Sequence, residues 1–353
     1  METKKWIVDI DVDKKNSYQQ LKEAAHYLQR NEVIAFPTET VYGLGANATS
    51  DAAVAKIFAA KGRPSDNPLI VHIAELGQLL EAVEMVSDKA QKLIEAFWPG
   101  PLTIIFKKKD GIFSSLVTAG LDTVAIRMPD HPLAIALIRA AGLPIAAPSA
   151  NCSGKPSPTT AHHVWEDLQG RIAGIVDGGE TGVGLESTVL DCTSGEFPII
   201  LRPGGITKEA IERVIGKVQL DPAMMNEKQT PKSPGMKYTH YAPNVPMYLM
   251  AGNWEKYNEL IKQKRQAGLK VGILATAETS KYYDADLVLS CGERNHLHTV
   301  AHCLYDTLRD FNKSNVDVIF AETFPKDGVG AAIMNRLEKA AGHRWLESDP
   351  RNN

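Results

Sequence analysis

Three features that would place the chain at once in a familiar class are missing. It contains no run of about 18 apolar residues, so no membrane-spanning helix is expected. Its first residues, METKKWIVDIDVDKK, carry acids in place of the apolar core of a signal peptide. No G-x-x-x-x-G-K-[ST] segment is present, which excludes an ordinary P-loop. The first two absences predict a protein with no attachment to a membrane, and the scattered cysteines described next indicate that it is cytoplasmic.

Paired cysteines and an excess of charge are missing as well. The four cysteines (Cys152, Cys192, Cys291 and Cys303) form no C-x-x-C pair, so neither a zinc site nor a redox motif is indicated. We therefore assign no protein side chains to a metal. The net charge is −3, and the residues before 219 are more acidic than basic. A basic face of the kind that coats nucleic acid is not expected, so any polyanion must bind in a local cavity.

Apolar runs alternate with amphipathic segments through the first part of the chain. We expect strands at 33–36, 69–73, 102–106, 123–128, 144–147, 187–190 and 198–201. We expect helices near 17–30, 50–61, 87–97, 131–141 and 207–216. The helix at 50–61 has natural N-cap candidates in Ser50 and Asp51. This alternation predicts a layered α/β fold.

The pattern breaks once, at residues 219–246. This segment holds five prolines and shows neither a helical nor a strand period, so it is interpreted as a linker. It also carries Lys237, Tyr238, His240 and Tyr241, which is more than a passive tether needs. A βα repeat with strands at 247–250, 271–276 and 316–322 follows it and predicts a smaller α/β domain. The expected parts are a domain at 1–218, the linker at 219–246 and a domain at 247–353.

One glycine motif imitates a dinucleotide-binding loop. Gly43, Gly45 and Ala48 match G-x-G-x-x-A ahead of a helix, with Asp66 about the right distance beyond them. In such a loop, however, the acid ends the second strand, whereas Asp66 precedes the strand at 69–73. A polar run, Thr38-Glu39-Thr40, also separates the first strand from the glycines. The dinucleotide interpretation is therefore rejected.

Lys61 and Arg63 lie where the helix at 50–61 ends. Cations in a last turn complement the helix dipole, which is the simplest explanation for them. The following loop, 65–68, ends in proline and leads directly into a buried strand. An arginine held beside such a loop is also well placed for bidentate contact with a phosphate.

A second candidate site is the segment 146–154, AAPSANCSG, at the carboxyl end of a strand. Ligands of α/β folds bind at such ends, and Ser149 and Asn151 suit a phosphate or a ribose, although a plain turn uses the same residue types. His72, inside an apolar strand, is compatible with a core histidine. Other polar residues stand at expected strand edges, namely Thr123, Arg127, Ser187 and Arg202.

Taken in order, seven segments resemble the Sua5/YrdC/YwlC family of threonylcarbamoyl-AMP synthases. They are PTETVYGLG, KGRPSDNPLIVHI, WPGPLT, TVAIRMP, APSAN, ESTV and LRPG. The segment SPGMKYTHYAP and the domain after it resemble the interdomain linker and C-terminal domain of the long Sua5 form. The resemblance spans essentially the whole chain. It implies an N-terminal α/β domain with a twisted sheet and a concave, positively lined cavity, and a smaller Rossmann-like C-terminal domain.

The resemblance also implies the site residues. The catalytic set around the phosphates is Lys61, Arg63, Ser149 and Asn151. The ATP-binding set is Arg63, Asn67, Thr123, Ser149, Ser157, Arg202, His240 and Tyr241, of which the last two reach over the nucleotide from the linker. The threonine pocket is Thr40, His72, Arg127, Ala147 and Ser187.

The implied reaction converts L-threonine, bicarbonate or CO2, and ATP with Mg²⁺ into threonylcarbamoyl-AMP and pyrophosphate. It is the first step toward N6-threonylcarbamoyladenosine at position 37 of tRNA. No Ser-His-Asp or Cys-His set is evident, and none is needed where positioning and charge stabilisation suffice. Downstream tRNA threonylcarbamoyltransferase proteins are expected to receive the product, and tRNA binding is compatible with this role but not required by it.

Two alternatives remain from the same family resemblance. Single-domain relatives suggest a double-stranded RNA-binding module, against which the acidic N-terminal half argues. Related domains in hydrogenase-maturation proteins suggest carbamoyl transfer to another acceptor. Those proteins carry zinc-finger cysteines, whereas this chain has no such pattern.

Overall fold

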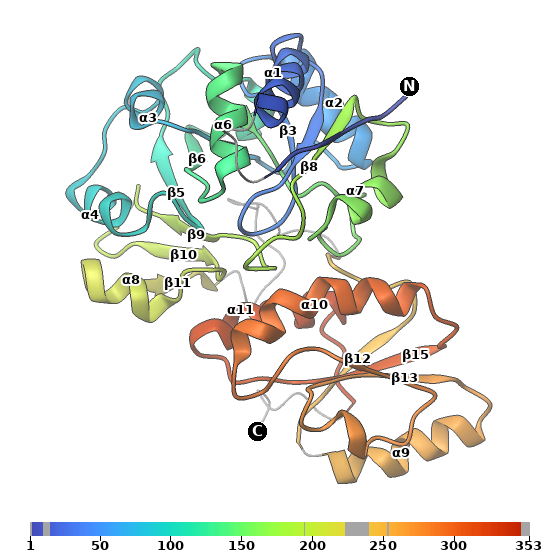
Figure 1. Cartoon of the computed structure of the whole chain (residues 1–353). Coiled ribbons are helices and arrows are strands. Elements are labelled where there is room, and N and C mark those ends of the chain that lie inside the picture. The colour runs from blue at the N-terminus through green and yellow to red at the C-terminus, as the bar shows by residue number, and fades with distance from the viewer. Residues whose placement is uncertain (1, 10–14, 194, 223–239, 253, 347–353) are drawn as a thin grey trace. The chain divides into compact units, whose positions relative to one another are not determined.

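In the computed structural model the chain forms two compact units, each an α/β structure (Figure 1). The structure describes residues 2–9, 15–193, 195–222, 240–252 and 254–346, without the side chains of 15–17. Most of the first 237 residues form the first unit. The second unit contains Tyr238–Asn353 together with two short segments, Gly154–Pro156 and Val183–Leu185. The α/β class expected from the sequence is confirmed.

The first unit alternates strands and helices along the chain. Its elements are β1 (Lys4–Ile7), α1 (Lys15–Gln29), β2 (Ile34–Phe36), β3 (Gly43–Asn47), α2 (Asp51–Lys61), β4 (Ile70–His72), α3 (Leu76–Ala82), α4 (Asp88–Phe97), β5 (Leu102–Lys107), α5 (Ser115–Thr118), β6 (Thr123–Arg127), α6 (Pro132–Ala141), β7 (Ile145–Ala146), α7 (Ala161–Leu168), β8 (Gly174–Asp177), β9 (Thr188–Asp191), β10 (Ile199–Arg202), α8 (Lys208–Ile215) and β11 (Gln219–Leu220). Among the described residues these strands form one mixed sheet in the order β1-β8-β2-β3-β7-β4-β6-β5-β9-β10-β11.

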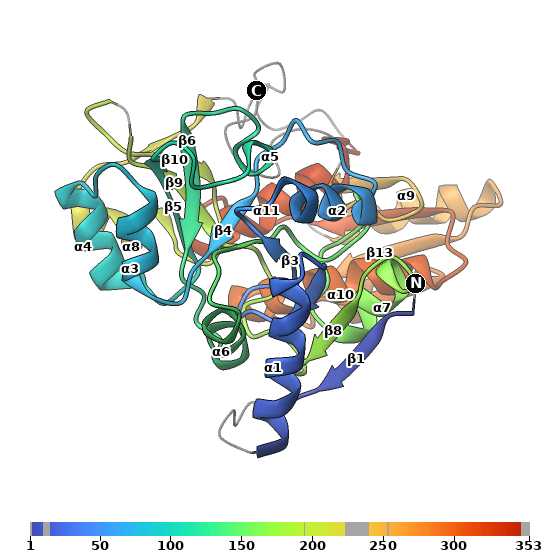
Figure 2. The ribbon, with the colours of Figure 1, turned by 90° about the horizontal axis from the view of Figure 1, so that it is seen from above.

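Helices cover one face of this sheet over most of its width. Val71 of β4 and Ile126 of β6 belong to a large apolar core that also includes Ile57 of α2, Leu93 of α4 and Ile211 of α8. Because successive side chains of a strand point to opposite faces, the residues before them in each strand point to the other side. Figure 2 shows α3, α4 and α8 gathered near β5, β9 and β10 on this helix-covered side.

The opposite face is covered over only part of its width. There α1 and α6 pack on β1, β8, β2, β3 and β7, as their shared apolar core and Figure 2 show. Beyond them a small cluster, Ile70, Ile105, Ala125, Val189 and Leu201, is built from strand residues alone. The strand residues His72, Thr103, Arg127 and Arg202, described below, point to this second face, which we call the site face.

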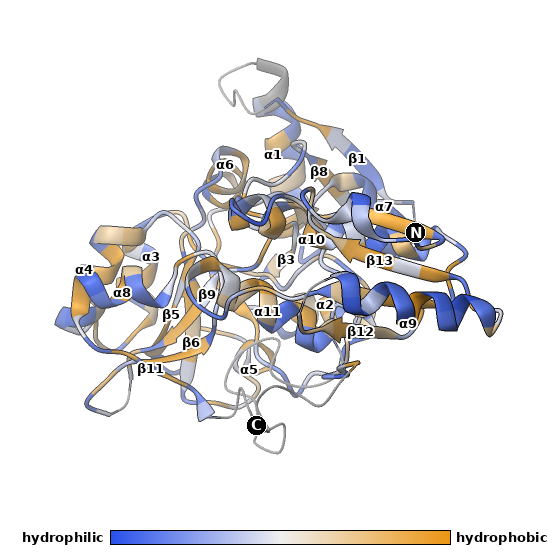
Figure 3. Ribbon diagram, turned by 90° about the horizontal axis from the view of Figure 1, so that it is seen from below, coloured by the Kyte–Doolittle hydropathy of each residue, from blue (hydrophilic) through white to orange (hydrophobic). Residues whose placement is uncertain are grey.

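The second unit is a four-stranded parallel sheet in the order β12-β15-β13-β14. Its elements are β12 (Met247–Met250), α9 (Trp254–Gln266), β13 (Val271–Ala275), the 3-10 helix η2 (Ser280–Tyr282), β14 (Leu287–Ser290), α10 (Leu297–Asn312), β15 (Val318–Glu322) and α11 (Gly328–Ala340). Its strands are largely buried, whereas α9 buries only Tyr257 and Ile261 and is mostly hydrophilic in Figure 3. Parallel strands joined by helices give the Rossmann-like layering that the resemblance implied.

Two sequence expectations change with the structure. The segment that contains Gly43 and Gly45 is itself a strand, β3, paired with β2 and β7, so these glycines form no phosphate-binding turn. A Cβ at Gly45 would lie 2.7 Å from the Phe36 ring, which explains this glycine by close packing. Within the expected linker, residues 219–220 form β11 beside β10, and residues 223–239 lie outside the described part of the chain.

Candidate active site

The ends of five neighbouring strands bring polar side chains to one edge of the sheet. Strands β4 and β6 are parallel and end together, with His72 beside Arg127. Strands β5 and β9 run the other way and begin at that edge, and β10 ends there. The sequence placed Arg127, Ser187 and Arg202 at the ends of separate strands. The strand order and directions bring these three ends to the same edge of the sheet.

A bulge in β10 directs Arg202 onto the site face. Ile200 pairs with Leu190, but Arg202 pairs with Val189, so one extra residue, Leu201, is accommodated between them. Opposed residues of antiparallel strands share a face, and Val189 belongs to the site-face cluster. Arg202 then donates from Nη2 to the carbonyl of Ser187 at 2.9 Å and to its Oγ at 3.2 Å. Ser187 Oγ also lies 2.7 Å from Thr103 Oγ1 of β5.

Lys61 fastens the loop that follows β7. Helix α2 ends at Gly62, whose left-handed conformation (φ 62°) turns the chain. The Lys61 ammonium donates to the carbonyl oxygens of Ser149 and, at 2.7 Å, of Asn151. Lys61 therefore does more than complement its helix dipole, because it holds the backbone of the predicted phosphate loop. The Ser149 hydroxyl donates to Asn151 Oδ1 at 2.6 Å within that loop.

The charge on Lys61 is costly in this position. The side chain is 4% exposed, and burial, with Arg63 nearby, lowers the pKa of Lys61 to about 7. The surrounding carbonyl oxygens favour the ammonium form and only partly offset that effect. Because this pKa lies near neutral pH, an anion that binds beside Lys61 is expected to raise the protonated fraction of the lysine.

Arg63 and Asn67 lie on the loop between α2 and β4. Arg63 Nη2 is 3.4 Å from the carbonyl oxygens of both Asn67 and Pro68, and Asn67 is buried. The guanidinium is thus placed against the start of the strand that ends at His72. This agrees with the expectation that the stiff loop positions Arg63.

The predicted threonine pocket contains a directional chain of hydrogen bonds. Arg127 Nη1 donates to Thr40 Oγ1 at 2.9 Å. Thr40 Oγ1 lies 2.8 Å from Thr38 Oγ1, and the Thr38 hydroxyl donates to the Val41 carbonyl at 2.7 Å. Since the hydrogen of Thr38 is used by Val41, the hydrogen of Thr40 points to Thr38. Thr40 therefore offers an incoming ligand an acceptor only.

His72 is a neutral member of this pocket. Burial, with Arg127 beside it, lowers the pKa of His72 to about 3. Its Nδ1 lies 3.3 Å from the Ile70 carbonyl, an acceptor, so Nδ1 carries the hydrogen of that contact. Ala147, also in the predicted pocket, is buried and donates its N–H to the same carbonyl at 2.9 Å. His72 is thus both a buried histidine and a neighbour of the pocket arginine.

The other predicted site residues are placed less centrally. Thr123 begins β6, so it lies about 13 Å along the strand from Arg127, which ends it. Ser157 is fully buried and donates to Glu186 Oε1 at 2.6 Å. His240 and Tyr241 belong to the second unit, where the Tyr241 ring stacks on Tyr305 with centroids 5.2 Å apart. Their expected position over a nucleotide stays a prediction.

Four further polar residues on this face were not predicted as site residues. They are Thr38, Glu39, Thr103 and Glu186. Glu39 contacts Arg127 through an ion pair of 2.5 Å, and Glu186 holds Ser157. Thr38 and Glu39 belong to the segment PTETVYGLG, and Glu186 belongs to ESTV. An acid inside a segment that carries the family resemblance was the signal in the sequence that could have identified Glu39 and Glu186.

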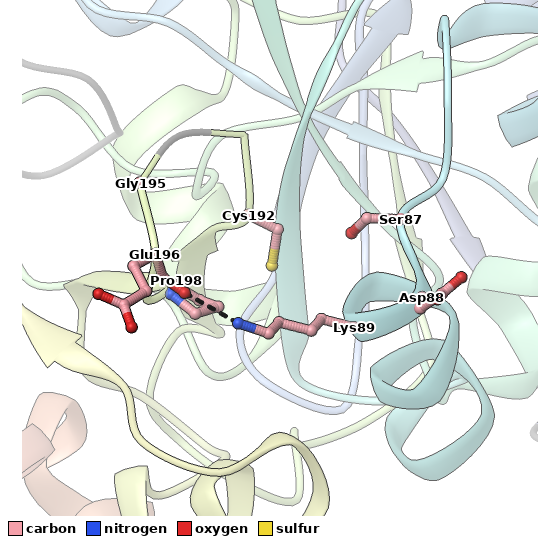
Figure 4. A pocket seen from close by; sticks show the side chains of 7 residues that line it. All are labelled: Ser87, Asp88, Lys89, Cys192, Gly195, Glu196 and Pro198. Atoms are coloured by element: carbon pink, nitrogen blue, oxygen red, sulfur yellow. Dashed lines mark hydrogen bonds between the residues drawn. The ribbon is translucent and has the colours of Figure 1, made fainter.

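A separate pocket carries none of this chemistry. It has a volume of about 300 Å³ and is lined by Ser87, Asp88, Lys89, Cys192, Gly195, Glu196 and Pro198 (Figure 4). Lys89 spans it and donates to the Glu196 carbonyl at 2.9 Å. Burial raises the pKa of the Cys192 thiol to about 12, so it is no nucleophile at neutral pH. None of the predicted site residues lines this pocket.

Two searches of the described residues complete the picture. No group of three or more His, Cys, Asp or Glu side chains there is arranged to hold a metal ion. Within the same residues, no helix combines the length and the apolar character that crossing a membrane requires.

Two family models together match most of the chain. One, described as telomere recombination (Sua5_yciO_yrdC), matches residues 26–204, and one described as the threonylcarbamoyl-AMP synthase C-terminal domain matches residues 206–342. The threonylcarbamoyl-AMP synthase of Bacillus subtilis (strain 168) is 58% identical and covers 98% of this chain and 100% of its own. That of Pyrococcus abyssi (strain GE5 / Orsay) is 47% identical over 93% and 95%. The crystal structure of P. abyssi Sua5 complexed with L-threonine is similar with a TM-score of 0.91 and 44% identity, over 98% of this chain and 100% of that one.

Proposed function

The chain belongs to the Sua5/YrdC family of threonylcarbamoyl-AMP synthases, and we propose that it makes threonylcarbamoyl-AMP and pyrophosphate from L-threonine, bicarbonate or CO2, and ATP. One structural observation carries this proposal. Strands β6, β4 and β7 are neighbours, and they place the Arg127 pocket and the loop held by Lys61 on adjacent parts of one sheet. An amino-acid pocket beside an anion site suits the transfer of a nucleotide to a carboxylated amino acid.

The chemistry needs positioning more than a nucleophile. The threonine amine first bonds to the carbon of CO2 and loses a proton, which gives an N-carboxylate. A carboxylate oxygen then bonds to the α-phosphorus of ATP as the bond to pyrophosphate breaks. Lys61 and Arg63 would stabilise the charge that gathers on the phosphates, and Arg127 would hold the threonine carboxylate.

The threonine hydroxyl has suitable partners in this site. Thr40 and His72 stand beside Arg127, and Thr40 offers an acceptor to a ligand hydroxyl. A pocket that hydrogen-bonds a substrate hydroxyl disfavours analogues that lack it. Selection of threonine over α-aminobutyrate, which has no hydroxyl, is the expected consequence.

We treat Mg²⁺ as part of the ATP substrate. The polar groups of the phosphate loop are a lysine, an arginine, a serine and an asparagine, which suit phosphate oxygens better than a divalent cation. The metal would then neutralise part of the charge on the phosphates. The protein side chains would bind the oxygens that the metal leaves free.

The expected setting is the cytoplasm, with the product passed to tRNA threonylcarbamoyltransferase proteins for N6-threonylcarbamoyladenosine formation at position 37. The linker is proposed to cover the nucleotide, with His240 and Tyr241 as its contribution. Double-stranded RNA binding is not favoured, because relatives named as synthases cover nearly the whole chain.

The direct test is mass spectrometry of the products formed from ATP, bicarbonate and each amino acid in turn. Threonylcarbamoyl-AMP should form with L-threonine, and pyrophosphate release should require both threonine and bicarbonate. Lys61→Ala and Arg63→Ala should each abolish that release while leaving the protein folded. Lys89→Ala, which removes a lysine from the pocket of Figure 4, is the matched control and should be fully active. Full activity of both site variants would refute the assignment of the phosphate site.

A further inference from the structure

Glu39 is a buried acid that the proposed mechanism does not use. It lies in the loop 37–42, between β2 and β3, and its side chain is 12% exposed. Thr38 fixes this loop, because its Oγ1 accepts the N–H groups of Thr40 and Val41 at 3.2 and 3.3 Å. A rigid turn therefore holds Glu39, and its carboxylate lies against Arg127 of the predicted threonine pocket.

The Glu39 carboxylate faces the guanidinium group of Arg127. Its Oε2 lies 2.5 Å from Nη2 of Arg127, whose side chain is 4% exposed. His131, which also lies near Glu39, has its pKa lowered by burial and adds no charge at neutral pH. Glu39 and Arg127 thus form a buried pair of opposite charges at the edge where the substrate amino acid is expected.

The carboxylate keeps its acceptor capacity. The contact with Arg127 does not have the angle of a hydrogen bond, and within the described residues neither oxygen of Glu39 accepts one. Arg127, by contrast, already donates from Nη1 to Thr40 and from Nε to the Gly100 carbonyl at 3.3 Å. A buried carboxylate without hydrogen bonds is costly unless a ligand supplies the donors.

A zwitterion complements this pair of charges. An α-amino acid carries a carboxylate and an ammonium group on one carbon, and an ammonium group has three donors. We propose that Glu39 accepts the α-ammonium group of the amino-acid substrate while Arg127 binds its carboxylate, so that the pair selects a zwitterion. This assignment rests on the proposed function and adds a residue to its threonine pocket. It leaves Thr40 free to accept the threonine hydroxyl.

The test compares two ligands that differ only in the amine. Calorimetric binding is measured for L-threonine and for 2,3-dihydroxybutanoate, in which a hydroxyl replaces the amine. In Glu39→Gln, which keeps the size but not the charge, threonine affinity should fall by about 10- to 100-fold, as expected for a charged hydrogen bond. The analogue keeps a hydroxyl donor at that carbon but carries no ammonium charge, so its affinity should fall much less than that of threonine. Glu32→Gln, which removes an acid paired with Lys56 at 2.9 Å, is the control and should bind both ligands as the wild type does.

Four results would overturn the inference. An equal fall in both affinities would mean that Glu39 acts only through Arg127, and an unchanged threonine affinity would mean that it does not contact the substrate. Wild-type protein that binds no threonine would refute the proposed function as well, which separates the two failures. If Glu39→Gln does not fold, Glu39→Asp keeps the charge but withdraws it by about 1.5 Å. That variant should also lose affinity for threonine selectively, and unaltered selectivity would refute the role.

Discussion

ATP binding should take up a proton through Lys61. In the ligand-free protein, burial and Arg63 lower the pKa of Lys61 from its ordinary 10.5 to about 7. The four negative charges of a triphosphate act in the opposite direction and favour the ammonium form. A lysine that is mostly neutral at pH 8 would therefore become charged when ATP binds.

The size of the effect follows from the shift. At pH 8 a group with a pKa of about 7 is charged in about one molecule in ten, so binding should take up nearly 0.9 proton if ATP restores the ordinary pKa. ATP affinity should then fall almost tenfold between pH 8 and pH 9. Phosphate groups, with a second pKa near about 6, are already deprotonated in this window and do not contribute.

Calorimetry in two buffers of different ionisation enthalpy measures this uptake directly. ATP is titrated at pH 8 without threonine or bicarbonate, so no turnover occurs. Lys61→Met, which keeps the length but cannot be charged, should bind ATP weakly and with no uptake. An ATP affinity of the wild type that is flat from pH 8 to pH 9, or the same uptake in both proteins, would refute the reasoning.

The lowered pKa of Lys61 also predicts how the stability of the folded protein changes with pH. The unfolded chain holds the Lys61 proton up to about pH 10.5, whereas the folded protein releases it near pH 7. The cost of burying this charge is therefore complete below pH 7 and disappears as the pH rises toward 10.5. Relative to Lys61→Met, the wild type should gain free energy of unfolding across that window, by at most about 5 kcal/mol.

Two further predictions concern the threonine pocket and the linker. Thr38→Val should lower the free energy of unfolding by about 1–3 kcal/mol and weaken threonine binding, because the N–H groups of Thr40 and Val41 lose their acceptor; unchanged denaturation and affinity would contradict this. Deleting residues 224–232 should speed ATP release if the linker covers the nucleotide, whereas a Gly/Ser segment of the same length should not. Equal release rates in both proteins would exclude the linker as a cover.

Much of the fold could be predicted because its apolar runs are continuous. The strands at β4, β5, β6, β9 and β10 and the helices α2, α4, α6 and α8 were expected within a few residues of their observed bounds. Strand β3 was not expected, since Gly43 and Gly45 have little strand propensity and are retained by the Phe36 ring packed against them. That contact is between residues of different strands, and local propensity cannot show it.

The sequence pointed to candidate site residues by their type, but it did not show which of them contact each other. Lys61 was expected near phosphates, but its contact with the Ser149 and Asn151 carbonyls joins residues about 90 positions apart. Glu39 was visible in the sequence as part of a polar run, and only its contact with Arg127, 88 positions away, shows why an acid belongs there. Two charged residues that are far apart in the chain, such as Glu39 and Arg127, leave no local pattern in the sequence that would identify them as a pair.

The bulge in β10 decides to which face of the sheet the Arg202 side chain points. Along a regular strand a side chain's face depends on whether its distance from a reference residue is odd or even. The bulge adds one residue between Ile200 and Arg202, so the alternation of faces is shifted by one position after Ile200. This shift brings the guanidinium group of Arg202 to Ser187. If Leu201 paired with Val189 as in a regular strand, Arg202 would oppose Thr188 and would point into the helix-covered core. The irregular pairing of this short stretch, and not the identity of the residue at 201, therefore decides on which face the arginine lies.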